Sequence, residues 1–241
     1  MKLNLLIVGG GSSLGLGLAK KMVREHHNVY IVTSRKNEIF QKNENVKVFT
    51  AKLDNAQDVR KITKKVLSNC NGFDVVFYNI GGGLGMSESM LSFHELNKIL
   101  WFNFGIIQEF NRILIPRIRP SGKIICVGSI ATRQIVGSLG YTIAKTALET
   151  YVKFMGKELA GQQKSILAIS IGAYWEVGNA MDRLRIKKPN IYKDFIRNRL
   201  PRKKMASTDE IVPFLSNFCV NDTSVFSGAV IPMDGAESNS L

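Results

Sequence analysis

Three residues of this chain have the types and the spacing that proton transfer requires. Tyr141 and Lys145 stand four positions apart, and Ser129 lies twelve positions upstream at the end of an apolar run. On a helix, positions i and i+4 share a face, so the Lys145 ammonium would approach the Tyr141 phenol and favour its ionised form. A Ser129 hydroxyl beside that helix would hydrogen-bond the substrate oxygen that the phenol protonates. A surface Tyr–Lys pair has the same spacing, so the surrounding elements must decide between the two interpretations.

A glycine-rich segment follows the first apolar run and precedes a helical pattern. It extends from Gly9 to Gly17. Its glycines would let the backbone approach a pyrophosphate, while the helix N-terminus supplies N–H donors. A tight turn without a ligand is the alternative, but the position after the first strand of an alternating chain favours dinucleotide binding. The expected contacts come from Gly11, Ser12, Ser13, Leu14 and Gly15.

The second apolar run ends without an acidic residue, in the sequence Thr33, Ser34, Arg35, Lys36. An acidic side chain at this place would hold the free 2′-hydroxyl of NAD. Cations and hydroxyls suit the 2′-phosphate of NADP instead. The pattern therefore predicts NADP(H) as the favoured cofactor, with Ser34 and Arg35 among its ligands. An exposed basic loop is the alternative.

The composition fits one folded domain over residues 1–241. Apolar residues make up 45% of the chain, which excludes a disordered protein, and no run is long enough to cross a membrane. The three cysteines are scattered, so a reducing cytoplasm is the expected location. The three histidines share no ligand spacing with them, and no metal is predicted.

Apolar runs alternate with helical patterns along the chain. Such alternation predicts an α/β fold with a doubly wound, Rossmann-like parallel sheet. Only residues 173–204, taken as a substrate-loop region, lack a clear pattern. Pro116 and Pro120 are expected to end the third helix. The expected strands are 3–9, 29–33, 46–50, 74–79, 123–128, 165–171 and 229–233, and the expected helices are 15–25, 56–68, 93–115, 141–160 and 208–218.

Several motifs follow one another along the chain in a characteristic order. They are Gly11-x3-Gly15-x-Gly17, Asn79-Ile80-Gly81, Asn103, Ser129 and Tyr141-x3-Lys145, followed by the ending from Ser227 to Gly235. By this combination the chain resembles the short-chain dehydrogenase/reductase family over essentially its whole length.

The resemblance implies a role for each matching residue. Tyr141 would be the general acid/base, and Lys145 would lower its pKa and bind the nicotinamide ribose. Ser129 would orient the substrate carbonyl. Asn103 would hold a water that links Lys145 to solvent, although an asparagine inside a helix also has purely structural uses.

Cofactor contacts are implied at Asn79, Gly81 and Asp54. Asp54 would touch the adenine, or it would serve instead as the N-cap of the following helix. Among the departures from the family pattern is the segment after the sixth apolar run. The chain has Ile171-Gly172 where the family has Pro-Gly, and the loop after it lacks the usual threonine, which leaves the contacts to the nicotinamide amide open.

Lys and Arg number 33 against 19 Asp and Glu, a net charge of +14. Many cations fall within residues 183–204, which favours an anionic substrate, although a solvated basic segment would look the same. We expect an oxidoreductase that interconverts a carbonyl and a secondary alcohol on a small sugar- or phosphate-type substrate. A 3-oxoacyl-[acyl-carrier-protein] reductase, which would bind an acidic carrier protein, is the alternative.

A hypothesis from another functional class is that the protein is a non-catalytic dinucleotide sensor or nucleic-acid binder on the same fold. Intact Ser129, Tyr141 and Lys145 argue against it, and nucleic acid is not an expected partner. The family resemblance also implies a homotetramer or homodimer built on the helices 93–115 and 141–160.

Overall fold

The fold is built on a parallel sheet of seven strands in the order β3-β2-β1-β4-β5-β6-β9. The computed structural model describes residues 2–35, 40 and 43–239. The central strands are buried on both faces, which is why their sequences are continuous apolar runs. The strands are β1 (Asn4–Val8), β2 (Asn28–Thr33), β3 (Val46–Thr50), β4 (Phe73–Tyr78), β5 (Ile118–Val127), β6 (Ser165–Ile171) and β9 (Val230–Met233).

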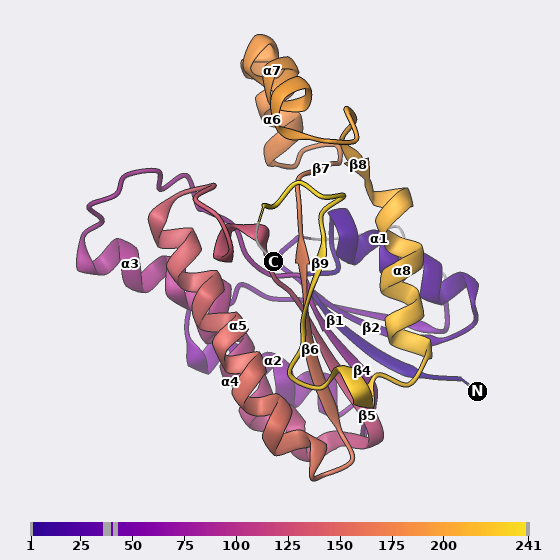
Figure 1. Cartoon of the computed structure of the whole chain (residues 1–241). Helices are drawn as coiled ribbons and strands as arrows, with labels where there is room; N and C mark the ends of the chain where they lie inside the picture. The colour runs from indigo at the N-terminus through magenta and orange to yellow at the C-terminus, as the bar shows by residue number, and fades with distance from the viewer. Residues whose placement is uncertain (1, 36–39, 41–42, 240–241) are drawn as a thin grey trace.

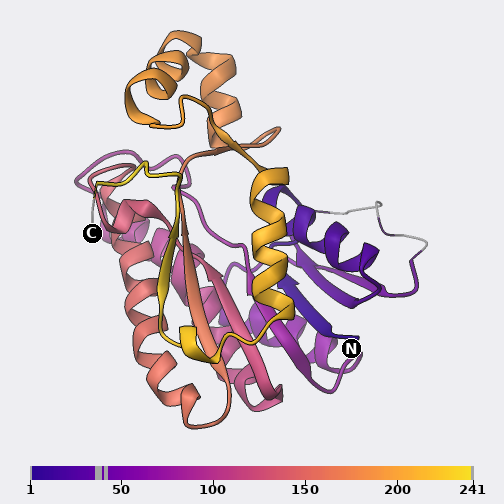
Figure 2. The same cartoon turned by 45° about the vertical axis from the view of Figure 1, so that its right-hand side comes forward.

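Helices cover both faces of the sheet, as the prediction of a doubly wound α/β fold requires (Figures 1 and 2). One face packs against α2 (Ala56–Leu67), α4 (Ile106–Leu114) and α5 (Leu139–Ala160). The other packs against α1 (Ser13–Arg24) and α8 (Thr208–Val220). Among the described residues, none of the helices combines the length and apolarity needed to span a bilayer.

The strand order reverses next to β1, because β2 and β4 lie on its two sides. In open parallel sheets, ligands bind at the carboxyl ends of the strands where the order reverses. The glycine-rich turn follows β1, and Asn79 to Gly81 follow β4. The topology therefore brings these two predicted segments to one crevice.

The expected helix 93–115 is interrupted. It divides into α3 (Phe93–Leu100), a π-helical turn η1 (Trp101–Gly105), α4 and a 3₁₀ turn η2 (Ile115–Arg117) that contains Pro116. Strand β5 begins five residues before the expected start, with a register shift opposite Phe73 and Val75. π-helical turns are frequent at functional sites, and Asn103 lies within this one.

Residues 173–204, which show no periodic pattern, contain two helices. The short strand β7 (Tyr174–Trp175) pairs with β8 (Ala206–Ser207), and between them α6 (Ala180–Lys187) and α7 (Pro189–Arg199) form an arm that projects beyond the carboxyl ends of the strands (Figures 1 and 2). Helix α7 buries no residue, and α6 buries only Asp182. Without a core-facing apolar stripe, such helices leave no 3.6-residue period in the sequence. We call α6 and α7 together the arm.

Candidate active site

The glycine-rich turn leaves no room for side chains at two of its glycines. A Cβ on Gly11 would overlap Oγ1 of Thr33, and one on Gly15 would overlap the carbonyl oxygen of Gly9. Ser12, the N-cap of α1, makes no side-chain capping bond, and the first turn carries no acidic residue. The N-terminus of α1 is therefore electrostatically suited to an anion, so these residues fit the diphosphate of a dinucleotide.

Two adjoining cavities, of about 600 and 400 Å³, run along the carboxyl ends of the strands. The larger one holds Ser129, Tyr141 and Lys145, and the smaller one holds Ser34 and Asp54. The residues that line both are Ser12, Arg35, Asn79, Ile80 and Gly81. The shared wall connects the smaller cavity, where the adenosine is predicted to bind, to the larger cavity, which contains the predicted catalytic residues.

The predicted cofactor residues divide into those that line the cavities and those behind the wall. Leu14 packs into the core beneath α1, and Gly15 packs against Gly9 and the Asn79 side chain. Neither of these two residues lines a cavity. Asp54 lines the smaller cavity, but the N-cap of α2 is Asn55, which accepts hydrogen bonds from two backbone N–H groups. The alternative of Asp54 as N-cap is therefore wrong. Lys36 lies outside the described residues.

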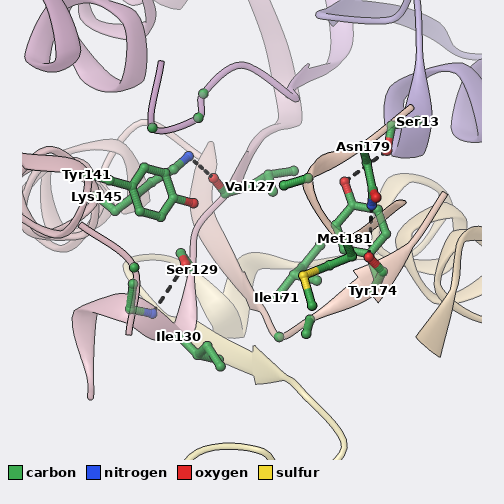
Figure 3. A pocket seen from close by; sticks show the side chains of 18 of the residues that line it. Ser13, Val127, Ser129, Ile130, Tyr141, Lys145, Ile171, Tyr174, Asn179 and Met181 are labelled. Carbon is green, nitrogen blue, oxygen red and sulfur yellow. Dashed lines mark hydrogen bonds between the residues drawn. The ribbon is translucent and has the colours of Figure 1, made fainter. Parts of the chain in front are cut away.

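Ser129, Tyr141 and Lys145 meet in the larger cavity (Figure 3). Ser129 begins the 3₁₀ turn η3 (Ile130–Thr132), where its Oγ accepts from the backbone N–H of Ala131 at 3.2 Å. Lys145 Nζ donates to the backbone oxygens of Val127, at 2.8 Å, and Ile80, at 3.4 Å. Its Nζ lies 5.9 Å from the centroid of the Tyr141 ring.

Burial controls the ionisation of both helix residues. It raises the pKa of the Tyr141 phenol, and the nearby Ser129 side chain only partly opposes this. Burial also lowers the pKa of Lys145 to about 8. In this structure the Lys145 ammonium faces two carbonyl oxygens and does not offset the effect of burial on the phenol, so its role in favouring an ionised phenol stays a prediction. A protonated phenol is the form that donates a proton to a carbonyl oxygen.

Asn103 is fully buried in η1 and holds the loop after β4. Its Oδ1 accepts from the N–H of Gly82 at 2.9 Å, and its Nδ2 donates to the Gly82 oxygen at 3.0 Å. A Cβ on Gly81 would lie 2.6 Å from Asn103 Oδ1 and 2.8 Å from Lys145 Nζ. Asn103 thus fixes the backbone that lies against Lys145, and its amide lies behind the cavity wall.

A partly buried carboxylate lies close to Gly128, the residue before Ser129. Glu149 lies one turn beyond Lys145 on α5, and its Oε1 would be 2.8 Å from a Cβ on Gly128. Burial raises the pKa of Glu149, and its buried Oε1 accepts no hydrogen bond from the described residues. Sequence reasoning gave Glu149 no role, because no motif marks it.

Another part of the wall of the larger cavity comes from the loop after β6 and from the arm. Arg183 and Arg199, two of the clustered cations, line it. Tyr174, which no sequence pattern singles out, lines it beside them and reaches Ser13. In the part of the chain that the structure describes, no group of three or more His, Cys, Asp or Glu side chains has the geometry of a metal site.

The fold and this arrangement define a dinucleotide-binding oxidoreductase. The chain belongs to the short-chain dehydrogenase/reductase family, and a family model described as Enoyl-(Acyl carrier protein) reductase matches residues 9–236. Levodione reductase of Leifsonia aquatica is 26% identical over 250 residues, which cover 97% of this chain and 93% of the relative.

Solved structures share the fold at lower identity. A short chain dehydrogenase family protein from Francisella tularensis has a TM-score of 0.87 at 20% identity, covering 98% of this chain and 99% of its own. The NADP complex of RhlG from Pseudomonas aeruginosa has a TM-score of 0.86 at 17% identity, covering 98% and 96%. At these identities the likeness establishes the fold.

Proposed function

We propose that this oxidoreductase depends on NADP(H) and interconverts a carbonyl and a secondary alcohol on a small anionic substrate of sugar or phosphate type. The observation that carries the substrate class is that Arg183 and Arg199 line the cavity that contains Tyr141. Guanidinium groups pair well with phosphates and carboxylates. Residues 173–204, which include the arm, then act as the substrate loop.

The preference for NADP(H) is supported by the residues after β2. Arg35 is exposed and lines both cavities, and Ser34 lines the smaller one. Together they offer a charged donor and a hydroxyl to a 2′-phosphate. The glycine turn and the N-terminus of α1 hold the diphosphate, with Asn79 and Gly81 lining the path toward Tyr141.

The bound nicotinamide supplies the hydride for reduction. Tyr141 holds its proton in the buried cavity and donates it to the carbonyl oxygen of the substrate. Ser129 donates a second hydrogen bond to the same oxygen and orients it. Lys145, fixed against Gly81 by its carbonyl bonds and by the position of Asn103, binds the nicotinamide ribose.

The proposal is tested by titrating the purified protein with NADPH and NADH while following nicotinamide fluorescence. Matched pairs of carbonyl compounds, one phosphorylated and one neutral, are then assayed for NADPH oxidation. We expect tighter binding of NADPH and faster turnover of the phosphorylated members. Tighter binding of NADH would overturn the cofactor assignment, and preference for the neutral members would overturn the substrate class.

A 3-oxoacyl-[acyl-carrier-protein] reductase is the second candidate. The description of the matching family model names an acyl carrier protein, and the arm is rich in cations that suit an acidic carrier. Turnover of a carrier-linked 3-oxoacyl group well above that of the same group on a short thioester would favour it. Equal or undetectable turnover of both would remove it.

We also propose a cytoplasmic homodimer or homotetramer. On α5, Phe154 is 76% exposed and Ile143 41%, and Phe93 at the start of α3 is 81% exposed. Such side chains on neighbouring helices suit a second copy of the chain. Light scattering coupled to gel filtration gives the oligomeric state, and a monomer at micromolar concentration would contradict the proposal.

A further inference from the structure

Tyr174 spans the crevice between the loop after β6 and the N-terminus of α1. Its hydroxyl lies 2.9 Å from Oγ of Ser13, a residue 161 positions away in the chain (Figure 3). Both residues line the larger cavity. We infer that Tyr174 is a further dinucleotide-binding residue, whose hydroxyl, paired with that of Ser13, donates a hydrogen bond to the diphosphate. The inference rests on the proposed dinucleotide site.

The number of protons in the pair supports a donor role. Two hydroxyls carry two protons, and the bond between them uses one. In the part of the chain that the structure describes, neither hydroxyl oxygen makes another hydrogen bond. One O–H is therefore left to donate, and a hydroxyl that already accepts a bond donates more strongly to an anion. Burial also raises the pKa of Tyr174, which keeps its hydroxyl protonated.

The pair stands where an anion is favoured. Ser13 is the first residue of α1 and has a φ of +52°, a conformation that non-glycine residues seldom adopt. It thus occupies the positive end of the helix dipole, in the turn whose glycines bring the backbone close to the expected diphosphate. Strained backbone of this kind concentrates at ligand-binding sites.

Tyr174 is held in place by the arm and by β8. In β7 it pairs with Ala206, and its carbonyl oxygen accepts from Nδ2 of Asn179, the N-cap of α6, at 2.8 Å. Its neighbour Trp175 donates from Nε1 to Asp182 at 3.2 Å. Tyr174 therefore stands between the expected diphosphate and the base of the arm, next to the wall of the substrate cavity.

The Ser13–Tyr174 bond could instead block the dinucleotide site, and removing it would then change NADPH affinity in the opposite direction. If the Ser13–Tyr174 bond had to break before a dinucleotide could enter, removing the phenolic hydroxyl would tighten binding. If the hydroxyl donates to the diphosphate, removing it weakens binding, because one charge-assisted hydrogen bond is lost. The direction of the change in NADPH affinity thus separates the two roles.

The experiment measures NADPH dissociation constants by fluorescence titration for the wild type, Tyr174→Phe, Ser13→Ala and the double variant. We expect about a tenfold loss for Tyr174→Phe, the scale of one hydrogen bond to a charged group. The double variant should lose less than the product of the single losses, because the two hydroxyls act as a pair. Tyr192→Phe, the same change on α7 outside the cavity lining, should bind as the wild type does.

A second variant distinguishes the effect of the Tyr174 hydroxyl on NADPH affinity from the effect of the position of the arm. Asp182→Asn weakens the support of Trp175 and Gly178 and keeps the Tyr174 hydroxyl. It should bind NADPH within about twofold of the wild type. Unchanged or tighter binding by Tyr174→Phe, or an equal loss in Asp182→Asn, would overturn the inference. A wild type that binds neither dinucleotide would instead overturn the proposed function.

Discussion

The Nζ atom of Lys145 donates to the backbone oxygen of Val127 over 2.8 Å, at the end of the strand that leads to Ser129. This contact fixes the lysine at the base of the cavity while burial lowers its pKa to about 8. The ammonium is therefore charged at neutral pH and loses its proton as the pH rises through about 8. Few lysines titrate so near to physiological pH.

Affinity for NADPH should depend on this proton. Below pH 8 the charged Lys145 donates to the nicotinamide ribose, and above it the charge is lost, so binding should weaken between pH 7 and 9.5. Fluorescence titrations across that range measure the effect. The Lys145→Met variant should bind NADPH weakly at every pH, and its affinity should not change near pH 8. A wild-type affinity that stays constant to pH 9.5 would contradict the assignment.

Tyr141→Phe should retain NADPH and lose turnover. The phenol is the proton donor in the proposed reaction, and general acids of this kind contribute roughly 10²- to 10⁴-fold to the rate. We expect a loss in that range once a substrate is known, with an NADPH dissociation constant within about twofold of the wild type. Turnover close to that of the wild type would remove Tyr141 from the role.

Arg35→Ala should discriminate between the two dinucleotides. Loss of a hydrogen bond to the 2′-phosphate should weaken NADPH binding by about 1.5–3 kcal/mol and leave NADH nearly unchanged. Arg24→Ala, which removes an arginine from the last turn of α1 outside both cavities, is the matched control. Equal losses for NADPH and NADH in Arg35→Ala would show that Arg35 does not contact the 2′-phosphate.

The sequence predicted the sheet and the crevice because both depend on local patterns. Strands such as β4 and β6 are buried on both faces and appear as unbroken apolar runs. The glycine turn is visible because close backbone contacts, such as that of Gly15 with Gly9, exclude a side chain.

What the sequence could not show depends on packing between distant segments. The arm helices bury almost nothing, so no periodicity reveals them. The Tyr174–Ser13 contact joins residues that no local motif connects. The spacing of Tyr141 and Lys145 indicated a shared helix face, but their ionisation is governed by desolvation, which only the folded chain determines.

Gly81→Ala should remove NADPH binding, because Gly81 separates Asn103 from Lys145. Its φ of +143° strains any other residue, and the added Cβ would lie 2.6 Å from Asn103 Oδ1 and 2.8 Å from Lys145 Nζ. Gly85→Ala is the matched control: Gly85 also has a positive φ, +78°, but a Cβ there meets no atom within 4 Å. Both variants carry backbone strain of roughly 1–3 kcal/mol, measurable as a fall in Tm. Only Gly81→Ala displaces Lys145, so equal NADPH affinities in the two variants would show that this arrangement does not hold the cofactor.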